Sequence, residues 1–213
     1  MNATTQKMRL DGPAGVIEAL QDAAALSDTV TTPRGVAVIA HPHPLFGGTM
    51  DNKVVQTLAR AFVASGWTAV RFNFRGVGAS EGVHDEGRGE ADDMSAVIEQ
   101  VAPDGVLAIA GFSFGAFVAM KTLNVLWEVR DIQRVALVGA SVARVHPEPL
   151  PEAAHERTLV VHGEHDDTVP LAAVLDWARP QSLPITVVPG GGHFFHGQLP
   201  LLKQLVVRHL RVD

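Results

Sequence analysis

Short apolar runs rich in β-branched residues alternate along the chain with longer stretches that show helical periodicity. The apolar runs predict strands at Val36–Ala40, Thr68–Phe72, Val106–Ala110, Val135–Val138, Leu159–Val161 and Ile185–Val188. The periodic stretches predict helices at Asn52–Ser65, Glu90–Val101, Gly115–Val129, Leu171–Ala178 and Leu199–Arg211. Several runs are apolar at every position, which is typical of strands covered on both faces of a parallel sheet.

Two earlier runs, near Lys7–Leu10 and Gly15–Gln21, alternate between apolar and polar residues and predict an antiparallel hairpin at the sheet edge. This β-β start, followed by repeated β-α units, predicts one doubly wound, mostly parallel α/β domain over residues 1–213. In such sheets the functional loops follow the carboxyl ends of the strands. The loops of interest therefore follow Ala40, Phe74, Ala110, Val161 and Val188.

Composition excludes several classes of protein. With 46% apolar and 19% charged residues among 213, the chain is globular rather than disordered. The absence of cysteine excludes disulfides, thiolate metal sites and a cysteine nucleophile, and the absence of tyrosine excludes a phenolic acid. A net charge of −6, from 17 basic and 23 acidic residues, argues against a nucleic-acid partner. Ten histidines are the unusual feature and raise the question of a metal site.

Neither a targeting segment nor a membrane span is indicated. Residues Met1–Leu10 lack the apolar core of a signal peptide. The longest uncharged windows, such as Gly105–Met120, are rich in glycine and shorter than the roughly 20 apolar residues that a spanning helix needs. We therefore expect a soluble, cytoplasmic protein with no membrane partner.

A Gly-x-Ser-x-Gly motif at Gly111–Gly115 follows one of the predicted strands and opens into a predicted helix. In this motif the serine sits on a sharp strand-to-helix turn, where the glycines avoid clashes. Residues Gly78–Gly82 fit the same pattern, but this copy is separated from its strand and no helix can start promptly after it. We therefore predict Ser113 as a nucleophile and Ser80 as a loop serine.

A serine nucleophile needs a base, and the base needs an orienting carboxylate, in the chain order Ser, Asp or Glu, His. His193 directly follows three glycines after the last predicted strand and is the predicted base, with His196 as its competitor. The loop after Val161 supplies the acid. Asp166 is the predicted orienting residue, with Asp167 and Glu164 as alternatives.

A tetrahedral oxyanion needs at least two preset N–H donors. The Phe114 N–H, directly after the nucleophile, is one predicted donor. The second is expected from the loop after Ala40, where Pro42 and Pro44 have no N–H and leave His43 and Leu45 as candidates. We favour His43.

These motifs together resemble those of the α/β-hydrolase superfamily, in particular the small bacterial serine hydrolases without a lid, including esterase-like and dienelactone-hydrolase-like enzymes. The resemblance lies in His41–Lys53, Arg71–Ser80, Gly111–Gly115 and the loops that hold Asp166 and His193. It implies an eight-stranded sheet whose first two strands form the edge hairpin. The family's Gly-x-x-Asp-x-x-Val-Pro pattern also favours Asp166 over its neighbour.

Larger members of this superfamily insert a helical cap between the sixth strand and the acid loop. Only residues 141–158 separate these elements here, which is too short for a cap domain. We therefore expect an open, shallow site. Its predicted apolar rim consists of Leu45, Phe46, Phe114 and Phe194.

The predicted function is hydrolysis of a small-molecule acyl ester through an acyl-enzyme, as in a carboxylesterase, with no cofactor and no metal. Peptidase, thioesterase and lactonase activities use the same machinery and stay open. A metal hydrolase is a further alternative, because His41, His43, His162, His165 and Asp166 have ligand residue types. A non-catalytic binding protein on the same scaffold is the third, and the oligomeric state is not predicted.

Overall fold

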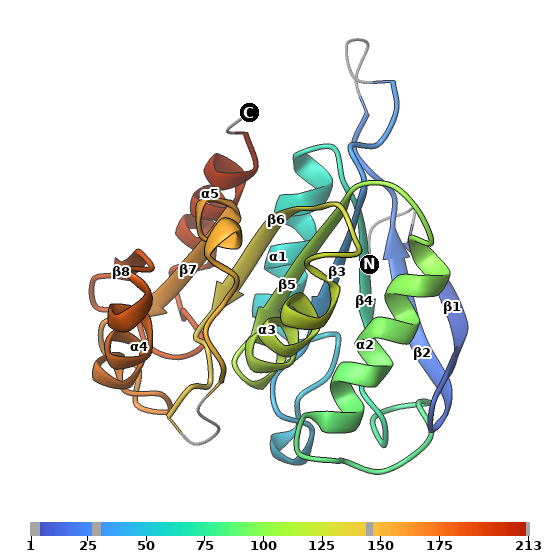
Figure 1. The fold of residues 1–213 in the computed structure, drawn as a ribbon, viewed down its shortest axis with the longest axis horizontal. Helices are drawn as coiled ribbons and strands as arrows, with labels where there is room; N and C mark the ends of the chain where they lie inside the picture. The colour runs from blue at the N-terminus through green and yellow to red at the C-terminus, as the bar shows by residue number, and fades with distance from the viewer. Residues whose placement is uncertain (1–4, 27–30, 144–146, 212–213) are drawn as a thin grey trace.

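The computed structural model describes residues 5–26, 31–143 and 147–211. Its strands are β1 (Thr5–Gly12), β2 (Gly15–Asp22), β3 (Val36–Ala40), β4 (Thr68–Phe72), β5 (Leu107–Phe112), β6 (Ile132–Val138), β7 (Thr158–Gly163) and β8 (Ile185–Val188). They form one sheet in the order β1-β2-β4-β3-β5-β6-β7-β8 (Figure 1). The β1–β2 hairpin pairs antiparallel with β4, and the strands from β4 to β8 are parallel.

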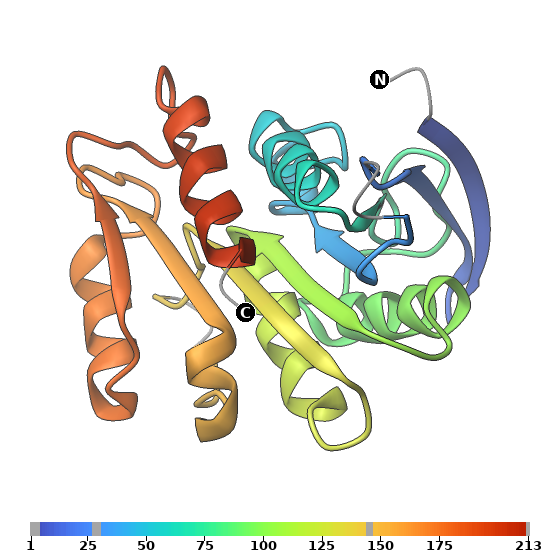
Figure 2. The same cartoon turned by 90° about the horizontal axis from the view of Figure 1, so that it is seen from above.

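Helices cover both faces of the sheet. On one face lie α1 (Lys53–Ala64) and α5 (Leu199–Arg211), and on the other α2 (Arg88–Val101), α3 (Phe114–Leu126) and α4 (Leu171–Ala178) (Figures 1 and 2). Short 3-10 helices occur at η1 (Pro44–Phe46), η2 (Glu152–Arg157) and η3 (Arg179–Gln181). Each face of the sheet has its own apolar core, so the central strands are buried on both sides.

The helix boundaries follow from local chemistry. In α1, the side chain of Asn52 accepts a hydrogen bond from the Val54 N–H at 2.9 Å and caps the first turn. Val55, Leu58 and Phe62 recur at helical spacing and are fully buried against the sheet. The predicted helix therefore forms, with its first and last predicted residues serving as caps.

The structure confirms the predicted doubly wound α/β sheet and its edge hairpin. The largest boundary differences are at the predicted strand Val135–Val138, which begins at Ile132, and at the predicted helix Gly115–Val129, which begins at Phe114 and ends at Leu126. The predicted strand Val106–Ala110 is observed as β5, from Leu107 to Phe112. The described residues between β6 and β7 contain only η2 and no cap domain. Residues 144–146, including His146, lie outside the described residues. In the described chain, no helix has the length and apolar character needed to cross a bilayer.

The sheet topology brings the candidate loops to one edge. From the adjacent strands β3 and β5, the chain proceeds to opposite sides of the sheet, which makes the crevice between them a switch point. The loops after β3, β5, β7 and β8 all leave carboxyl ends of parallel strands and so emerge at the same edge. This edge contains the predicted site residues.

Candidate active site

Ser113 occupies the turn between β5 and α3 in a strained backbone conformation. Its φ is +57° and its ψ is −117°, a region that non-glycine residues rarely adopt. The Ser113 N–H donates to the Val138 carbonyl at 2.9 Å, and its own carbonyl accepts from the Ala116 N–H at 3.0 Å and the Ser141 N–H at 3.2 Å. These hydrogen bonds hold the strained turn and fix the position of the serine.

The glycines of the motif are required by close backbone contacts. A Cβ at Gly111 would lie 2.2 Å from the Gly115 carbonyl oxygen. A Cβ at Gly115 would lie 2.4 Å from the Ala40 carbonyl oxygen and 2.5 Å from that of His41. Only glycine therefore lets the first turn of α3 pack directly against the end of β3.

The structure brings Ser113, His193 and Asp166 together in one hydrogen-bonded chain. Ser113 Oγ lies 3.0 Å from His193 Nε2, and His193 Nδ1 lies 2.7 Å from Asp166 Oδ2. All three residues are buried although they come from loops after β5, β8 and β7. The His193 ring also packs against Phe112 with a centroid distance of 4.9 Å, which restricts its orientation.

The carboxylate of Asp166 is well satisfied. Its Oδ1 accepts hydrogen bonds from the Thr168 N–H at 3.0 Å and the Val169 N–H at 2.7 Å, while Oδ2 faces His193. Burial alone would raise the pKa of Asp166, but the hydrogen bonds from His193 and the Val169 N–H outweigh it and lower that pKa. Asp166 therefore stays ionised and can orient His193.

The loops that carry the acid and the base contact each other through glycines. A Cβ at Gly163 would lie 2.4 Å from the Gly191 carbonyl oxygen, and the His165 N–H donates to that oxygen at 2.8 Å. Phe195 is fully buried beneath the second loop at a positive φ of 51° and anchors it in the core. Sequence reasoning missed this anchor because Phe195 was indistinguishable from its exposed neighbour Phe194.

The alternative base and acids lie elsewhere. His196 is exposed, and its ring packs near Phe194 at a centroid distance of 5.9 Å. Asp167 is exposed at the turn surface. Glu164 accepts a hydrogen bond from the Gly190 N–H at 2.8 Å and so connects the two loops rather than contacting His193.

Ser80 has structural hydrogen bonds. Its Oγ donates to the Asn73 carbonyl at 2.7 Å and accepts from the Glu18 N–H at 2.9 Å. Both partners are backbone groups, so this hydroxyl connects the loop after β4 to β2. Neither bond involves a group that could act as a base.

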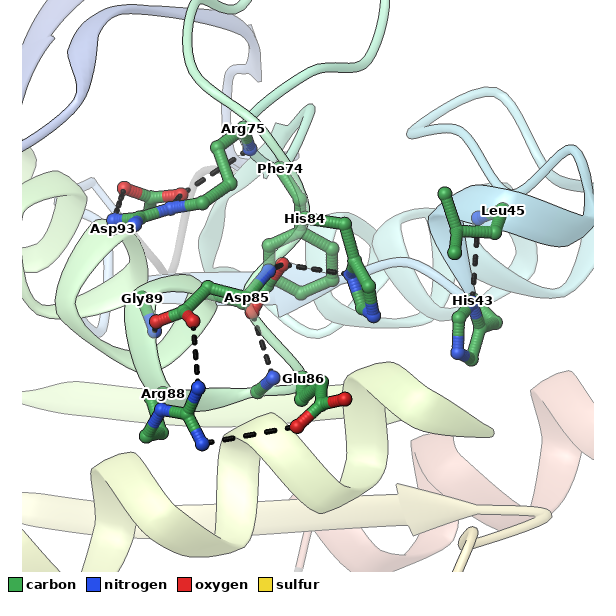
Figure 3. A network of polar contacts seen from close by, with 12 residues as sticks. His43, Leu45, Phe74, Arg75, His84, Asp85, Glu86, Arg88, Gly89 and Asp93 are labelled. Carbon is green, nitrogen blue, oxygen red and sulfur yellow. Dashed lines mark hydrogen bonds and ion pairs between the residues drawn. The ribbon is translucent and has the colours of Figure 1, made fainter.

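The loop after β3 is held by His41, whose ring is fully buried. Its Nδ1 donates to the Pro42 carbonyl at 2.6 Å, and its Nε2 accepts from the Phe74 N–H at 3.0 Å. Because the Pro42–His43 peptide is trans, the His43 N–H points away from that carbonyl. The Leu45 N–H donates to His43 Nδ1 at 3.3 Å (Figure 3), so Leu45 is already engaged within the loop. That His43 rather than Leu45 is the second donor stays a prediction.

Burial lowers the pKa of His41 from 6.5 to about 4, and it lowers that of His209 in α5 to about 4 as well. Between pH 6.5 and 4 the unfolded chain therefore binds protons that the folded protein does not. We expect the free energy of unfolding to decrease as the pH falls through this window, by up to about 3 kcal/mol for His41 alone.

Urea unfolding at several pH values between 7 and 4 measures this decrease. Of the two histidines, His209 is the one that lies outside the candidate site. His209→Gln removes its contribution and should reduce the pH dependence of the free energy of unfolding. A free energy of unfolding that stays constant between pH 6.5 and 4 would contradict the expected burial of neutral histidines.

Three predicted rim residues are exposed beside the site. Phe46 is 78% exposed, Leu45 69% and Phe194 44%. Phe46 packs against the His43 ring and Phe194 against the His193 ring, with centroid distances of 4.8 and 5.1 Å, so apolar side chains lie on both sides. The expected rim position of Phe114 is wrong: the residue is only 4% exposed and belongs to the core, because its ring packs against that of Phe74 with a centroid distance of 5.8 Å.

Two of the histidines considered as metal ligands, His41 and His162, have other partners. His41 is engaged as described above, and His162 Nε2 lies 2.9 Å from the Val169 carbonyl and 3.4 Å from Asp166 Oδ2. Burial lowers the pKa of His162, so this ring is neutral and contributes to the wall around the carboxylate. Over residues 5–26, 31–143 and 147–211, no cluster of three or more potential ligands has metal-binding geometry.

Comparisons with known proteins agree with this architecture. The X-Pro dipeptidyl-peptidase (S15) family model matches residues 22–132, about half of the chain. The uncharacterized protein RP471 of Rickettsia prowazekii is 31% identical over 205 residues, covering 87% of this chain and 80% of that protein.

Two solved structures are similar over nearly the whole fold. XC6422 from Xanthomonas campestris, a serine hydrolase without a lid, is 33% identical with a TM-score of 0.84, covering 99% of this chain and 95% of that one. A serine hydrolase homologue from Coxiella burnetii is 34% identical with a TM-score of 0.81, covering 96% and 97%. The chain therefore belongs to the α/β-hydrolase superfamily of serine hydrolases, and within it to the S15 family whose model it matches.

Proposed function

We propose that the protein hydrolyses small or exposed acyl esters through a Ser113–His193–Asp166 triad, as a carboxylesterase does. The observation that carries this proposal is the chain of contacts at 3.0 and 2.7 Å from Ser113 Oγ through the His193 ring to Asp166. This arrangement matches the geometry by which a histidine activates a serine and is itself held in one tautomer by a carboxylate.

In the proposed first step, His193 Nε2 takes the proton of Ser113 while Oγ attacks the ester carbonyl carbon. The carbonyl oxygen becomes an oxyanion, which the N–H groups of Phe114 and His43 would stabilise. The C–O bond to the alcohol then breaks as His193 gives its proton to the leaving oxygen. The products of this half are the free alcohol and an ester on Ser113.

In the second half, water replaces the alcohol. His193 takes a proton from the water as its oxygen attacks the acyl carbon, and the same N–H groups would hold the second oxyanion. Collapse returns the proton to Ser113 and releases the carboxylic acid. The ionised Asp166 stabilises the imidazolium in both halves, consistent with its lowered pKa.

The rim supports a small, partly apolar acyl substrate. Exposed Leu45 and Phe46 on one side and Phe194 on the other offer apolar contacts without enclosing the ligand. The described residues between β6 and β7 supply no cap that would bury a long chain. Accessible short acyl groups therefore fit this proposal best.

A peptidase is the second candidate, because the S15 match over residues 22–132 belongs to a family of X-Pro dipeptidyl-peptidases. Amide hydrolysis would use the same triad but requires protonation of a poorer leaving group. Thioester cleavage would need no additional group. Substrate comparison therefore separates these activities better than the triad does.

A matched substrate panel tests the ester proposal. We expect p-nitrophenyl acetate and butyrate to be hydrolysed with a kcat/KM at least about 100-fold above that for an X-Pro p-nitroanilide, and with a preference over long acyl chains. Faster cleavage of the X-Pro amide or of an acyl thioester would assign the activity to the alternative class. Activity that resists a serine phosphonate but is lost on chelation would instead indicate a metal hydrolase.

A further inference from the structure

His84, in the segment between β4 and α2, pairs with a buried acid that the triad does not use. Glu90 is fully buried in the first turn of α2, and its Oε1 lies 2.8 Å from His84 Nδ1. The same carboxylate accepts hydrogen bonds from the Asp85 N–H at 2.9 Å and the Gly87 N–H at 2.7 Å. A buried carboxylate is costly unless it is paired and hydrogen-bonded, so these contacts fix His84 relative to α2.

The His84 ring reaches the loop after β3 (Figure 3). Its centroid lies 4.8 Å from that of His43 and 5.4 Å from that of Phe114, and the last two are 4.8 Å apart. The three rings therefore contact one another. His43 and Phe114 are the residues whose N–H groups form the proposed oxyanion hole, so the His84 ring packs against the side chains of both proposed donor residues.

The segment that carries His84 is itself anchored at both ends. Arg75 Nε and Nη2 donate to the Asp93 carboxylate at 2.9 and 2.7 Å, and this pairing raises the pKa of Arg75 (Figure 3). At Gly87, a Cβ would lie 2.5 Å from the Phe117 ring, so the segment packs directly on α3. His84 is thus held against the helix that begins at Phe114, rather than on an unsupported loop.

We propose that His84, held in place by Glu90, is a positioning residue for the oxyanion hole. Its ring would restrict the movement of His43 and Phe114 and keep their N–H groups aimed at the developing charge. The inference rests on the proposed function. Its physical basis is that such donors act because they are preset, and a displacement of about 1 Å can lower a rate about 100-fold.

His84→Ala tests this role. With the short-chain ester as substrate, we expect kcat to fall roughly 10- to 100-fold while KM changes by less than about twofold, because the donors act mainly in the transition state. The matched control is Val83→Ala, which alters an adjacent side chain that is 77% exposed. This control should retain wild-type kcat and KM.

Two further variants separate positioning from stability. His84→Phe keeps an aromatic ring against His43 and Phe114 but cannot pair with Glu90. His84→Gln offers Glu90 a polar partner but has no ring. If the ring positions the donors, His84→Phe recovers part of kcat and His84→Gln does not, whereas the thermal unfolding temperature is higher for His84→Gln. Recovery of kcat by His84→Gln alone, or an unchanged kcat in His84→Ala, overturns the proposal.

The rate of Ser113 phosphonylation by a fluorophosphonate gives a readout that does not depend on the ester. If wild-type protein is phosphonylated but cleaves no ester, the ester proposal fails, and the same variant series is measured by phosphonylation. If His84→Ala is as fast as wild type while Ser113→Ala is unreactive, the positioning role fails and the serine hydrolase stands. The positioning role is supported if His84→Ala lowers the rate of ester hydrolysis or of phosphonylation and His84→Phe recovers part of that rate.

Discussion

Ser113→Ala is expected to lower kcat/KM for p-nitrophenyl acetate by a factor of about 10⁴ or more. The substitution removes the oxygen that attacks the acyl carbon, and no cysteine in the chain can replace it. Initial rates under identical conditions, with circular dichroism to verify folding, measure the loss. A variant that retains more than a few per cent of activity would show that the nucleophile lies elsewhere.

Ser80→Ala is the matched control because it removes the serine of the second Gly-x-Ser-x-Gly motif. Its activity should stay close to wild type, since Ser80 Oγ bonds only the backbone of Asn73 and Glu18. Loss of these two bonds should destabilise the fold by about 1–3 kcal/mol. An inactive but folded Ser80→Ala protein would reverse the assignment of the two motifs.

Asp166→Asn is expected to lower kcat by roughly 10³- to 10⁴-fold without unfolding the protein. The Thr168 and Val169 N–H groups point at Oδ1 and would hold the amide oxygen of the asparagine there. The amide NH₂ then faces His193 Nδ1, so the ring proton must lie on Nε2, the nitrogen that faces Ser113 Oγ. In this tautomer His193 cannot accept the serine proton.

Asp167→Asn is the control for that experiment, because it changes the adjacent exposed acid in the same way. It should keep a wild-type kcat. If Asp167→Asn is impaired and Asp166→Asn is not, the orienting acid has been misassigned. Equal unfolding free energies of the two variants, from urea titration, would show that the difference in kcat arises from chemistry rather than from folding.

Much of the fold could be predicted because its strands are buried on both faces and read as continuous apolar runs. The strands Val36–Ala40, Thr68–Phe72 and Ile185–Val188 have the predicted bounds. The end of β5 could not be predicted by hydrophobicity, because Gly111 belongs both to the strand and to the turn motif. A Cβ at Gly111 would meet the Gly115 carbonyl oxygen, so the turn requires this glycine although it lies within the strand.

The candidate triad could be predicted because its residues follow strand ends in a fixed order and carry distinctive side chains. The role of Phe114 was harder, since an aromatic side chain after the nucleophile could face either solvent or core. The His84–Glu90 pair was missed entirely. The three-residue spacing from Gly87 to Glu90 indicates a helix start at which the Glu90 carboxylate binds the backbone N–H of Gly87. No local pattern indicates that His84 faces the loop after β3.

The most direct test of the account is the site of covalent labelling by a fluorophosphonate probe. Intact mass and peptide mapping should show one phosphonyl adduct, located on Ser113. The adduct should be absent from Ser113→Ala and retained in Ser80→Ala. An adduct on Ser80, or unlabelled wild-type protein that still cleaves the ester, would contradict Ser113 as the nucleophile.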